Sequence, residues 1–308
     1  MSSVDVTPIR RIAFVGLGRM GAPMAARLIA SRFDLRLVDI DPTVVSAFAA
    51  SHGGTPCADI AEACRGADSL VTMLPSDAAV RAALLGPEGA EVALAPGSTA
   101  IDMSTSSPVL TREVGRRLGA AGIDFVDAPV MGGVSFAQDG TLEIMAGGEA
   151  SAVVRCGEVF AAVGRHVYAC GGTGTGHTLK ALANFVNTAT LTVFIEAMTI
   201  GRASGLDDRF MADALATLCT GRQHPLAKKI VPHVLTGRFA TGMAIGLTAK
   251  DLTIAAAIGP DIGTAMPIAA AISELWERAA ADLGPQVDHT EMARWWPGTA
   301  AAAGSADG

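Results

Sequence analysis

The stretch RIAFVGLGRMGAPMAARL, residues 11–28, decides the fold of this chain. It begins with the apolar run 12–15, which is typical of a strand buried on both faces of a parallel sheet. After Gly16 the apolar residues recur at spacings of three and four, as they do on one face of a helix. Gly16, Gly18 and Gly21 therefore stand at a strand-to-helix turn in the order G-x-G-x-x-G. Such a turn brings backbone amides and a helix N-terminus close to a pyrophosphate.

Three glycines at this spacing also occur in ordinary turns, so their setting decides the interpretation. The motif follows a strand and precedes a helix, as a dinucleotide-binding turn must. Asp39 then ends a second strand-like run, 35–38, at the distance expected of an acid that binds ribose. The predicted dinucleotide site consists of the turn and this acid, namely Gly16, Leu17, Gly18, Arg19, Met20, Gly21 and Asp39.

Asp39 favours NAD over NADP. Its carboxylate can accept hydrogen bonds from both hydroxyls of the adenosine ribose, and it would repel a 2′-phosphate. Ile40 follows, where chains that bind NADP often carry a basic residue. Arg36 is close in the sequence, but strand alternation does not require it to point at the ribose. We predict NAD as the cofactor, with NADP as the alternative.

The composition indicates a folded protein of enzyme size. Half of the 308 residues are hydrophobic and 17% are charged, which excludes disorder except at the termini. The net charge is −7 without a long run of either sign, and there is one Tyr, so we expect no nucleic-acid partner. The apolar stretches are broken by polar residues and no signal segment opens the chain, so we expect no membrane association.

The five cysteines are scattered and form no C-x-x-C pair. An odd number of separated cysteines predicts reduced thiols in a cytoplasmic protein, and no metal site is expected.

Strand-like and helical patterns alternate from Asp39 to residue 168. Strands are expected at 69–74, 99–103, 123–126, 142–146 and 166–168, and helices at 44–50, 60–65, 77–85, 108–118 and 150–163. This alternation predicts a doubly wound, mostly parallel sheet. Ligands bind outside the carboxyl ends of such strands, so the glycine turn, 74–75, 104–105 and 127–129 are expected to share one crevice.

The pattern changes near Cys170. A glycine-rich loop, 171–176, leads into one long helical pattern over 177–204, and further helices follow to about residue 283. We predict an all-helical second domain joined to the first by this long helix. The expected domains are 1–170 for dinucleotide binding and 171–297 for substrate binding or dimerisation, with a flexible tail at 298–308.

Lys180 is the residue expected to carry the chemistry. It is the only charged residue in 171–195, and Asn184 lies one turn further on the same helix face. In a cleft of low polarity the pKa of a lysine falls, so it can give or take a proton near neutral pH. The alternative is a solvated lysine at the edge of a buried helix.

Hydride transfer also needs groups that hold the rest of the substrate. The loop DAPVMGG, 127–133, can offer the amides of Gly132 and Gly133 to a carboxylate. Asn184 can hydrogen-bond the substrate or the ammonium of Lys180. His177 is interpreted as a residue of the helix start, with a place in the cleft as the alternative.

Four separated stretches resemble the β-hydroxyacid dehydrogenase family, in its 3-hydroxyisobutyrate dehydrogenase-like branch. They are GLGRMGAPMA (16–25), DAPVMGGVSFAQDGTLEIMAGG (127–148), GTGTGHTLKALAN (172–184) and KDLTIA (250–255), and they occur in family order. The resemblance implies an NAD(P)-dependent dehydrogenase with a Rossmann-type domain, a helical second domain and a long connecting helix. It also implies a homodimer or homotetramer.

The resemblance assigns roles position by position. Lys180 matches the catalytic lysine and Asn184 its companion, while Lys250 matches a lysine near the nicotinamide end of the cofactor. Further matches are Leu74, Pro75 and Thr105 for the cofactor and Gly132 and Gly133 for the substrate. Met131 departs from the family, which usually has Ser there, and a flexible apolar side chain puts the choice of acid in doubt.

These observations predict hydride transfer between a small 3-hydroxy acid and NAD, with Lys180 as general acid and base. One alternative is an imine reductase of the same architecture, against which the pair Lys180 and Asn184 argues. The other is a non-catalytic NAD(H)-binding sensor.

Overall fold

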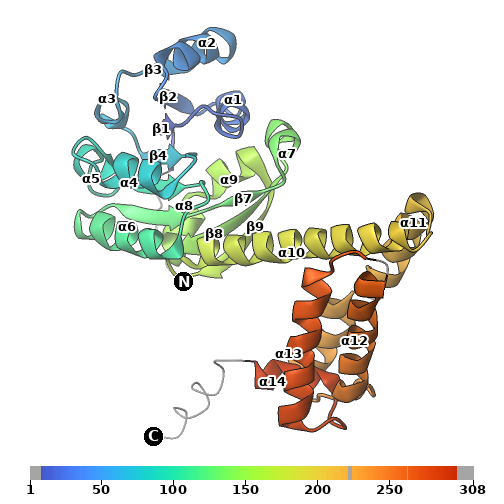
Figure 1. Ribbon diagram of the computed structural model, residues 1–308. Coiled ribbons are helices and arrows are strands. Elements are labelled where there is room, and N and C mark those ends of the chain that lie inside the picture. Colours follow the sequence, from blue (N-terminus) through green and yellow to red (C-terminus); the bar gives the residue numbers. More distant parts are fainter. Residues whose placement is uncertain (1–7, 221–223, 262, 297–308) are drawn as a thin grey trace, which may run out of the picture. The chain divides into compact units, whose positions relative to one another are not determined.

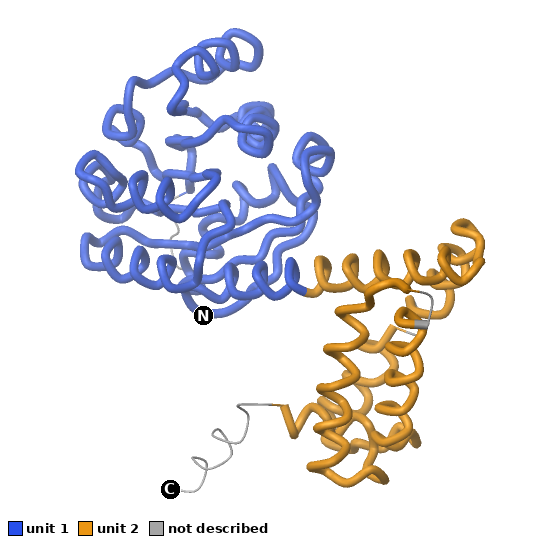
Figure 2. Tube along the Cα trace, in the orientation of Figure 1, with its two compact units in different colours: residues 1–185 blue, residues 186–308 orange. Residues whose placement is uncertain are grey.

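The computed structural model describes residues 8–220, 224–261 and 263–296. The chain divides into two compact units, Met1–Phe185 and Val186–Gly308, and the division falls inside one long helix, α10 (Thr175–Ala203) (Figure 2). The domain boundary at residue 170 stays a prediction. The tail predicted at 298–308 lies outside the described residues.

The first unit is built on a nine-stranded sheet with helices packed on it (Figure 1). The strands β1 to β6 are all parallel and lie in the order β3-β2-β1-β4-β5-β6. This is the strand order of doubly wound dinucleotide-binding sheets, so the predicted Rossmann-type fold is confirmed. The strands are β1 (Arg11–Val15), β2 (Asp34–Val38), β3 (Thr55–Pro56), β4 (Ser69–Thr72), β5 (Thr99–Asp102), β6 (Asp124–Asp127), β7 (Val130–Met131), β8 (Leu142–Gly148) and β9 (Gly164–Gly171).

The sheet continues beyond β6 with mixed pairing. β8 runs antiparallel to both β6 and β7, and β9 runs parallel to β8. A parallel connection needs about a dozen residues or more, and the link between Met131 and Leu142 is too short for one. The strand predicted at 166–168 extends over Gly164–Gly171 as β9, because it pairs along most of β8.

Four helices of the first unit begin where the sequence places a cap. The side chains of Asp41, Asp59, Ser76 and Ser107 accept amide hydrogen bonds at the starts of α2, α3, α4 and α6. The single helix predicted at 150–163 is wrong: the chain forms two helices that meet at Cys156, next to the weak helix former Gly157. The helices are α1 (Gly21–Ala30), α2 (Pro42–His52), α3 (Ile60–Cys64), α4 (Asp77–Leu85), α5 (Ala90–Ala93), α6 (Pro108–Ala120), α7 (Val134–Asp139), α8 (Ala150–Arg155) and α9 (Gly157–Val163).

The central strand β1 is buried on both faces. Ile12 and Phe14 belong to the apolar core on one side of the sheet, and Ala13 and Val15 belong to the core on the other. Such double burial explains why the strand reads as a continuous apolar run. The turn that follows β1 is therefore anchored at the centre of the unit.

Within its described residues the second unit consists of helices, the loops between them and one isolated bridge. It contains the end of α10, then α11 (Asp208–Cys219), a π-helical segment η2 (Leu226–Val234), α12 (Ile245–Asp261), α13 (Pro267–Leu283), a 3-10 turn η3 (His289–Glu291) and α14 (Met292–Trp295). Its buried core is small and consists of Ile245, Ala249, Ala279, Ala280 and Met292.

The long helix α10 is apolar and open to solvent over most of its length. Among the described residues it is the one helix whose length and composition would suffice to cross a membrane, and none of its apolar window is buried.

Candidate active site

The turn after β1 needs glycine at two of its three positions. Gly16 has φ +102°, and a Cβ on it would lie 2.4 Å from the carbonyl oxygen of Met73. A Cβ on Gly21 would lie 1.9 Å from the carbonyl oxygen of Gly16, so only glycine lets α1 start this close to the strand. At Gly18 a Cβ would meet nothing within 4 Å. The space beside Gly18 is where the glycine motif predicts a pyrophosphate.

The start of α1 is also free to bind an anion. No side chain caps α1, whereas side chains of Asp or Ser cap α2, α3, α4 and α6. The first amides of a helix carry partial positive charge and need a partner. A phosphate group beside Gly18 would supply that partner, so the turn fits a dinucleotide.

Asp39 lies at the end of β2 and is tied to the glycine turn. Its Oδ2 accepts a hydrogen bond of 2.6 Å from the amide of Leu17, and its Oδ1 accepts one of 3.1 Å from Asp41. The side chain is only half-buried, so free lone pairs remain for a ribose. Asp39 therefore shapes the turn, a role that sequence analysis did not foresee.

The ends of β4 and β5 meet the same turn. Leu74 Cδ2 would be 3.1 Å from a Cβ on Gly16, and the Leu74 amide donates a 2.9 Å hydrogen bond to Ser104 Oγ. Pro75 follows Leu74 and Thr105 follows Ser104 in the sequence, and both side chains are exposed. The structure thus brings the neighbourhoods of Gly16, Leu74 and Thr105 together at one edge of the sheet.

Lys180 stands in the second turn of α10, within the first unit. Its side chain is 8% exposed, and burial lowers its pKa from the ordinary value. Among the described residues no carboxylate lies within ion-pair distance of its ammonium group. Asn184 is exposed one turn further on. The lowered pKa makes the ammonium of Lys180 a stronger proton donor, in the direction that acid–base work requires.

A buried carboxylate, Asp127, holds the start of α10. Its Oδ1 accepts a 2.7 Å hydrogen bond from the amide of Gly174, and its Oδ2 accepts one of 2.8 Å from the amide of His177. Burial raises the pKa of Asp127, while these two amides and His177 oppose that rise. This role of Asp127 and His177 was not predicted from the sequence. The feature of the sequence that could have indicated the role of Asp127 is an acidic residue at the end of a buried strand.

The loop predicted to bind substrate follows the short strand β7. Gly132 and Gly133 are exposed and have φ +137° and +84°, and a Cβ on Gly132 would lie 2.7 Å from Cβ of Phe136. Only glycine fits this bend, which leads directly into α7. Met131 is half-buried in β7 and pairs with Glu143 of β8.

Lys250 lies in the second unit, in α12. Its side chain is 59% exposed, and its Nζ forms a 3.1 Å ion pair with Asp251. Its predicted contact with the cofactor stays a prediction.

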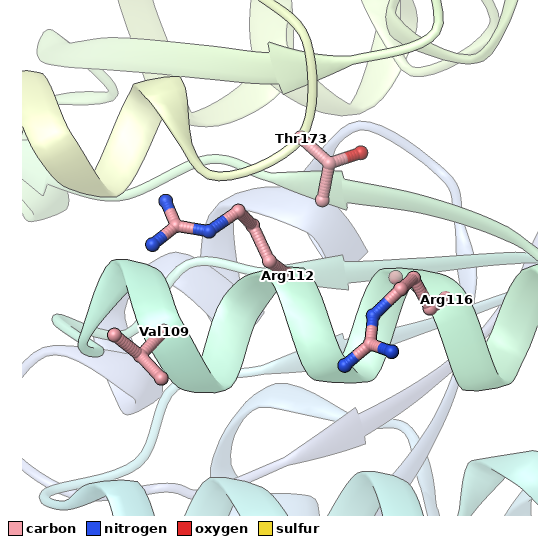
Figure 3. Close-up of a pocket in the computed structure, with 5 residues that line it drawn as sticks. Val109, Arg112, Arg116 and Thr173 are labelled. Atoms are coloured by element: carbon pink, nitrogen blue, oxygen red, sulfur yellow. The ribbon is translucent and has the colours of Figure 1, made fainter.

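A pocket of about 490 Å³ lies elsewhere, on α6 and the loop before α10 (Figure 3). The guanidinium groups of Arg112 and Arg116 point in different directions there, and no predicted site residue lines it. The lining residues are Val109, Arg112, Gly115, Arg116 and Thr173. Within the described residues, no group of three or more His, Cys, Asp or Glu side chains could hold a metal ion.

Comparison with known proteins identifies the family. Residues 11–172 match the model of the NAD-binding domain of 6-phosphogluconate dehydrogenase. Residues 174–296 match the model of the NAD-binding domain of NADP-dependent 3-hydroxyisobutyrate dehydrogenase. The chain belongs to the β-hydroxyacid dehydrogenase family.

Two relatives agree with this assignment, and a third structure shares the fold. The 2-(hydroxymethyl)glutarate dehydrogenase of Eubacterium barkeri is 31% identical over 87% of this chain and 88% of its own. A Mycobacterium tuberculosis 3-hydroxyisobutyrate dehydrogenase, solved with L-serine, is 30% identical with a TM-score of 0.66, over 93% of this chain and 99% of that one. An imine reductase from Myxococcus stipitatus, solved with NAD+, has a TM-score of 0.81 at 18% identity over 94% of this chain and 99% of its own. That last likeness concerns the fold alone.

Proposed function

We propose that the protein is an NAD-dependent dehydrogenase of a small 3-hydroxy acid, or the reductase of the matching carbonyl acid. The observation that carries the proposal is Lys180, a buried lysine in the unit that holds the glycine turn, with no carboxylate partner among the residues that the structure describes. Similarity to 2-(hydroxymethyl)glutarate dehydrogenase and to an enzyme solved with L-serine supports the substrate class.

In this mechanism Lys180 moves one proton. The bound dinucleotide supplies the acceptor for the hydride that leaves the substrate carbon. During oxidation the neutral amine of Lys180 takes the hydroxyl proton as the carbonyl forms, and during reduction its ammonium returns that proton to the oxygen. Asn184 orients the ammonium and the substrate, and the amides of Gly132 and Gly133 hold the substrate carboxylate.

Two substitutions at Lys180 test the proton transfer. Lys180→Ala should reduce kcat by roughly a hundredfold or more, since general acid–base catalysis contributes factors of this order. Lys180→Arg keeps the charge but cannot release a proton at neutral pH, so it should be as inactive as the alanine variant. NADH binding, followed by fluorescence titration, should stay within about threefold in both. Near-normal turnover by either variant would refute the mechanism.

The cofactor is proposed to be NAD because of Asp39. A panel of 3-hydroxy acids assayed with NAD and NADP in parallel tests substrate and cofactor together. Asp39→Ala should lower the ratio of kcat/KM with NAD to kcat/KM with NADP. The substitution removes a hydrogen-bond acceptor for the ribose hydroxyls, and it also removes a charge that repels a 2′-phosphate. A wild-type preference for NADP would contradict this part of the proposal.

Met131 is proposed to shift the choice of acid toward larger or more apolar substrates. Met131→Ser restores a hydroxyl at the position where the resemblance expects one. The variant should gain kcat/KM on small polar hydroxy acids and lose it on apolar ones. An unchanged substrate profile would show that Met131 does not contact the substrate.

The two alternatives give different outcomes in the same assays. Reduction of cyclic imines without oxidation of any hydroxy acid would identify an imine reductase. Tight NADH binding with no turnover of either class would identify a sensor. We further propose that the protein is a cytoplasmic homo-oligomer.

A further inference from the structure

The pocket on α6 takes no part in the mechanism above, and its walls come from two segments of the first unit. Val109, Arg112, Gly115 and Arg116 lie on α6, and Thr173 lies in the loop that leads into α10 (Figure 3). Its volume of about 490 Å³ is within the range of sites that bind small molecules. The ligand that it suits follows from the charges of its walls.

The loop before α10 packs closely on α6 at this place. A Cβ on Gly115 would lie 2.7 Å from Cγ2 of Thr173, so a side chain there would push the loop away from the helix. A Cβ on Gly174 would lie 3.2 Å from Cγ of Arg112, which places the stem of this arginine against the loop. The charged group of Arg112 therefore projects from a packed junction, with part of its side chain already held in place.

Two neighbouring arginines are paired with carboxylates. Arg117 of α6 donates from Nε to Glu91 at 2.9 Å. Arg81 of α4 donates to both carboxylate oxygens of Glu113, each at 2.6 Å. The carboxylates of Glu91 and Glu113 are thereby engaged by arginines outside the pocket.

Arg112 and Arg116 have no such pairing. Among the residues that the structure describes, neither guanidinium forms an ion pair or a hydrogen bond, and both side chains are exposed. Arg116 interacts with Glu113 electrostatically, but Glu113 is bound to Arg81. The two arginines stand four residues apart on one face of α6. Arginine stays charged at physiological pH, so the pocket carries two positive charges without a direct anionic partner.

This local positive charge contrasts with the rest of the chain, whose net charge is −7. Attraction of anions is therefore a property of this pocket and not of the surface as a whole. Guanidinium groups bind the oxygens of phosphates and carboxylates, in both cases through charged hydrogen bonds. The pocket consequently suits an anionic small molecule.

The arrangement of the two arginines narrows the class of anion. Their guanidinium groups point in different directions, so an anion with a single charged centre would meet only one of them (Figure 3). A molecule with two separated anionic groups can meet both. A phosphate monoester carries about −1.5 to −2 charges at neutral pH and offers three acceptor oxygens. It therefore gains more than a carboxylate does in an open site, where water screens each contact.

We propose that this pocket binds a small molecule with two phosphate groups, one held by Arg112 and the other by Arg116, beside Thr173. The site is separate from the glycine turn, because none of the residues predicted to bind the cofactor lines it. The inference goes beyond the proposed reaction and does not depend on it.

Calorimetric titration of the full chain with fructose 1,6-bisphosphate tests the binding. The chain is first saturated with NADH, so that the glycine turn is not available to phosphate. We expect a dissociation constant on the order of 0.1 mM at low salt for a ligand of this size, and weaker binding as the salt concentration rises. Inorganic phosphate, which has one charged centre, should bind at least about tenfold more weakly.

Substitutions of the two arginines test the location. Arg112→Gln and Arg116→Gln should each weaken binding of the bisphosphate roughly tenfold, since each removes a charged hydrogen-bonding partner. Arg32→Gln is the matched control, because Arg32 is exposed in the turn between α1 and β2 and forms no ion pair among the described residues. This control removes the same charge and should change the dissociation constant by less than about twofold. All three side chains are exposed, and circular dichroism checks that the variants fold.

Three results would overturn the inference. The first is the absence of binding by the wild type at about 1 mM bisphosphate and low salt. The second is an equal loss in Arg32→Gln and in the two pocket variants, which would show attraction to the charge of the whole unit. The third is binding of citrate as tight as that of the bisphosphate, which would contradict the phosphate class. None of these measurements uses turnover, so failure of the hydroxy-acid assays would refute the proposed function and leave this inference in place.

Discussion

At the scale of single residues, Gly18 and Gly21 stand in one motif for different physical reasons. A methyl group on Gly21 would collide with the backbone of Gly16, so Gly21→Ala should destabilise the first unit by roughly 1–3 kcal/mol. A methyl group on Gly18 meets no protein atom, so Gly18→Ala should fold normally yet weaken NADH binding severalfold. Thermal unfolding and fluorescence titration of both variants check this. Equal unfolding temperatures, or unchanged NADH binding in Gly18→Ala, would contradict it.

Asp288 makes the stability of the second unit depend on pH. Burial raises the pKa of Asp288, but hydrogen bonds from Thr290 and Thr241 outweigh it and hold the pKa well below the usual range. A depressed folded-state pKa means that this stabilisation is complete above the unfolded-state pKa of about 4 and is lost as pH falls.

Asp288→Asn tests that dependence. The variant should be less stable than the wild type at pH 7 by on the order of 1 kcal/mol, the usual worth of a cap. The difference should shrink as pH falls below about 4, where Asp288 in the unfolded chain becomes protonated. Urea unfolding at several pH values measures it. A difference that stayed constant down to about pH 2 would exclude the carboxylate as its cause.

The residues that the sequence could predict are those whose requirement is local. The glycine turn follows from its spacing next to a strand, and the structure gives a steric reason at Gly16 and Gly21. The contacts of His177 with Asp127 and Ser104 were not predictable, because they join residues 50 and 73 positions apart. Only the sheet order brings these residues together.

At the scale of elements, Glu196 connects two helices of the second unit. It lies on α10, and its carboxylate accepts hydrogen bonds of 2.8 and 2.9 Å from the amides of Ile268 and Ala269 at the start of α13. No side chain of α13 itself provides this cap. A negative charge at a helix N-terminus is favourable, so Glu196 fixes α13 against α10.

Glu196→Ala should therefore cost the second unit about 1–2 kcal/mol. Glu196→Gln keeps an acceptor and should lose less. Glu274 is exposed on α13 and takes no part in this cap, so Glu274→Gln serves as the matched control and should have little effect. Urea unfolding of the three variants gives the comparison. Equal effects at positions 196 and 274 would rule out the cap.

Most helices and strands were predicted from their periods and flanking residues, and the details that depend on packing were not. The helical pattern predicted at 177–204 corresponds to α10, because the helical period repeats over a helix of 29 residues. The break at Cys156 and the antiparallel pairing of β8 depend on packing against neighbours that periodicity does not describe. The cap on α13 comes from another helix, so its own sequence carries no sign of it.

At the scale of the whole molecule, the apolar surface of α10 needs a cover. Phe185 is 69% exposed and Leu191 is 59% exposed, and Leu182, Val186 and Ile195 are exposed as well. A lipid bilayer is one candidate by length and composition. It is disfavoured because Glu196 lies on this helix with its carboxylate bound to the backbone of α13, and Arg202 forms an ion pair with Asp208 near its end.

We predict that a second copy of the chain packs against this apolar surface of α10. Light scattering after size exclusion, without detergent, should give a dimer or tetramer. Leu191→Glu places a charge on the apolar surface and should weaken association at least tenfold, since burying an unpaired charge costs several kcal/mol. Val92→Glu changes an equally exposed position of the first unit, 68% exposed, and should leave the assembly intact. Circular dichroism confirms that both variants fold. A monomeric wild type at micromolar concentration, or recovery of the chain only in detergent, would contradict the prediction, because the apolar helix would then have a different cover or none.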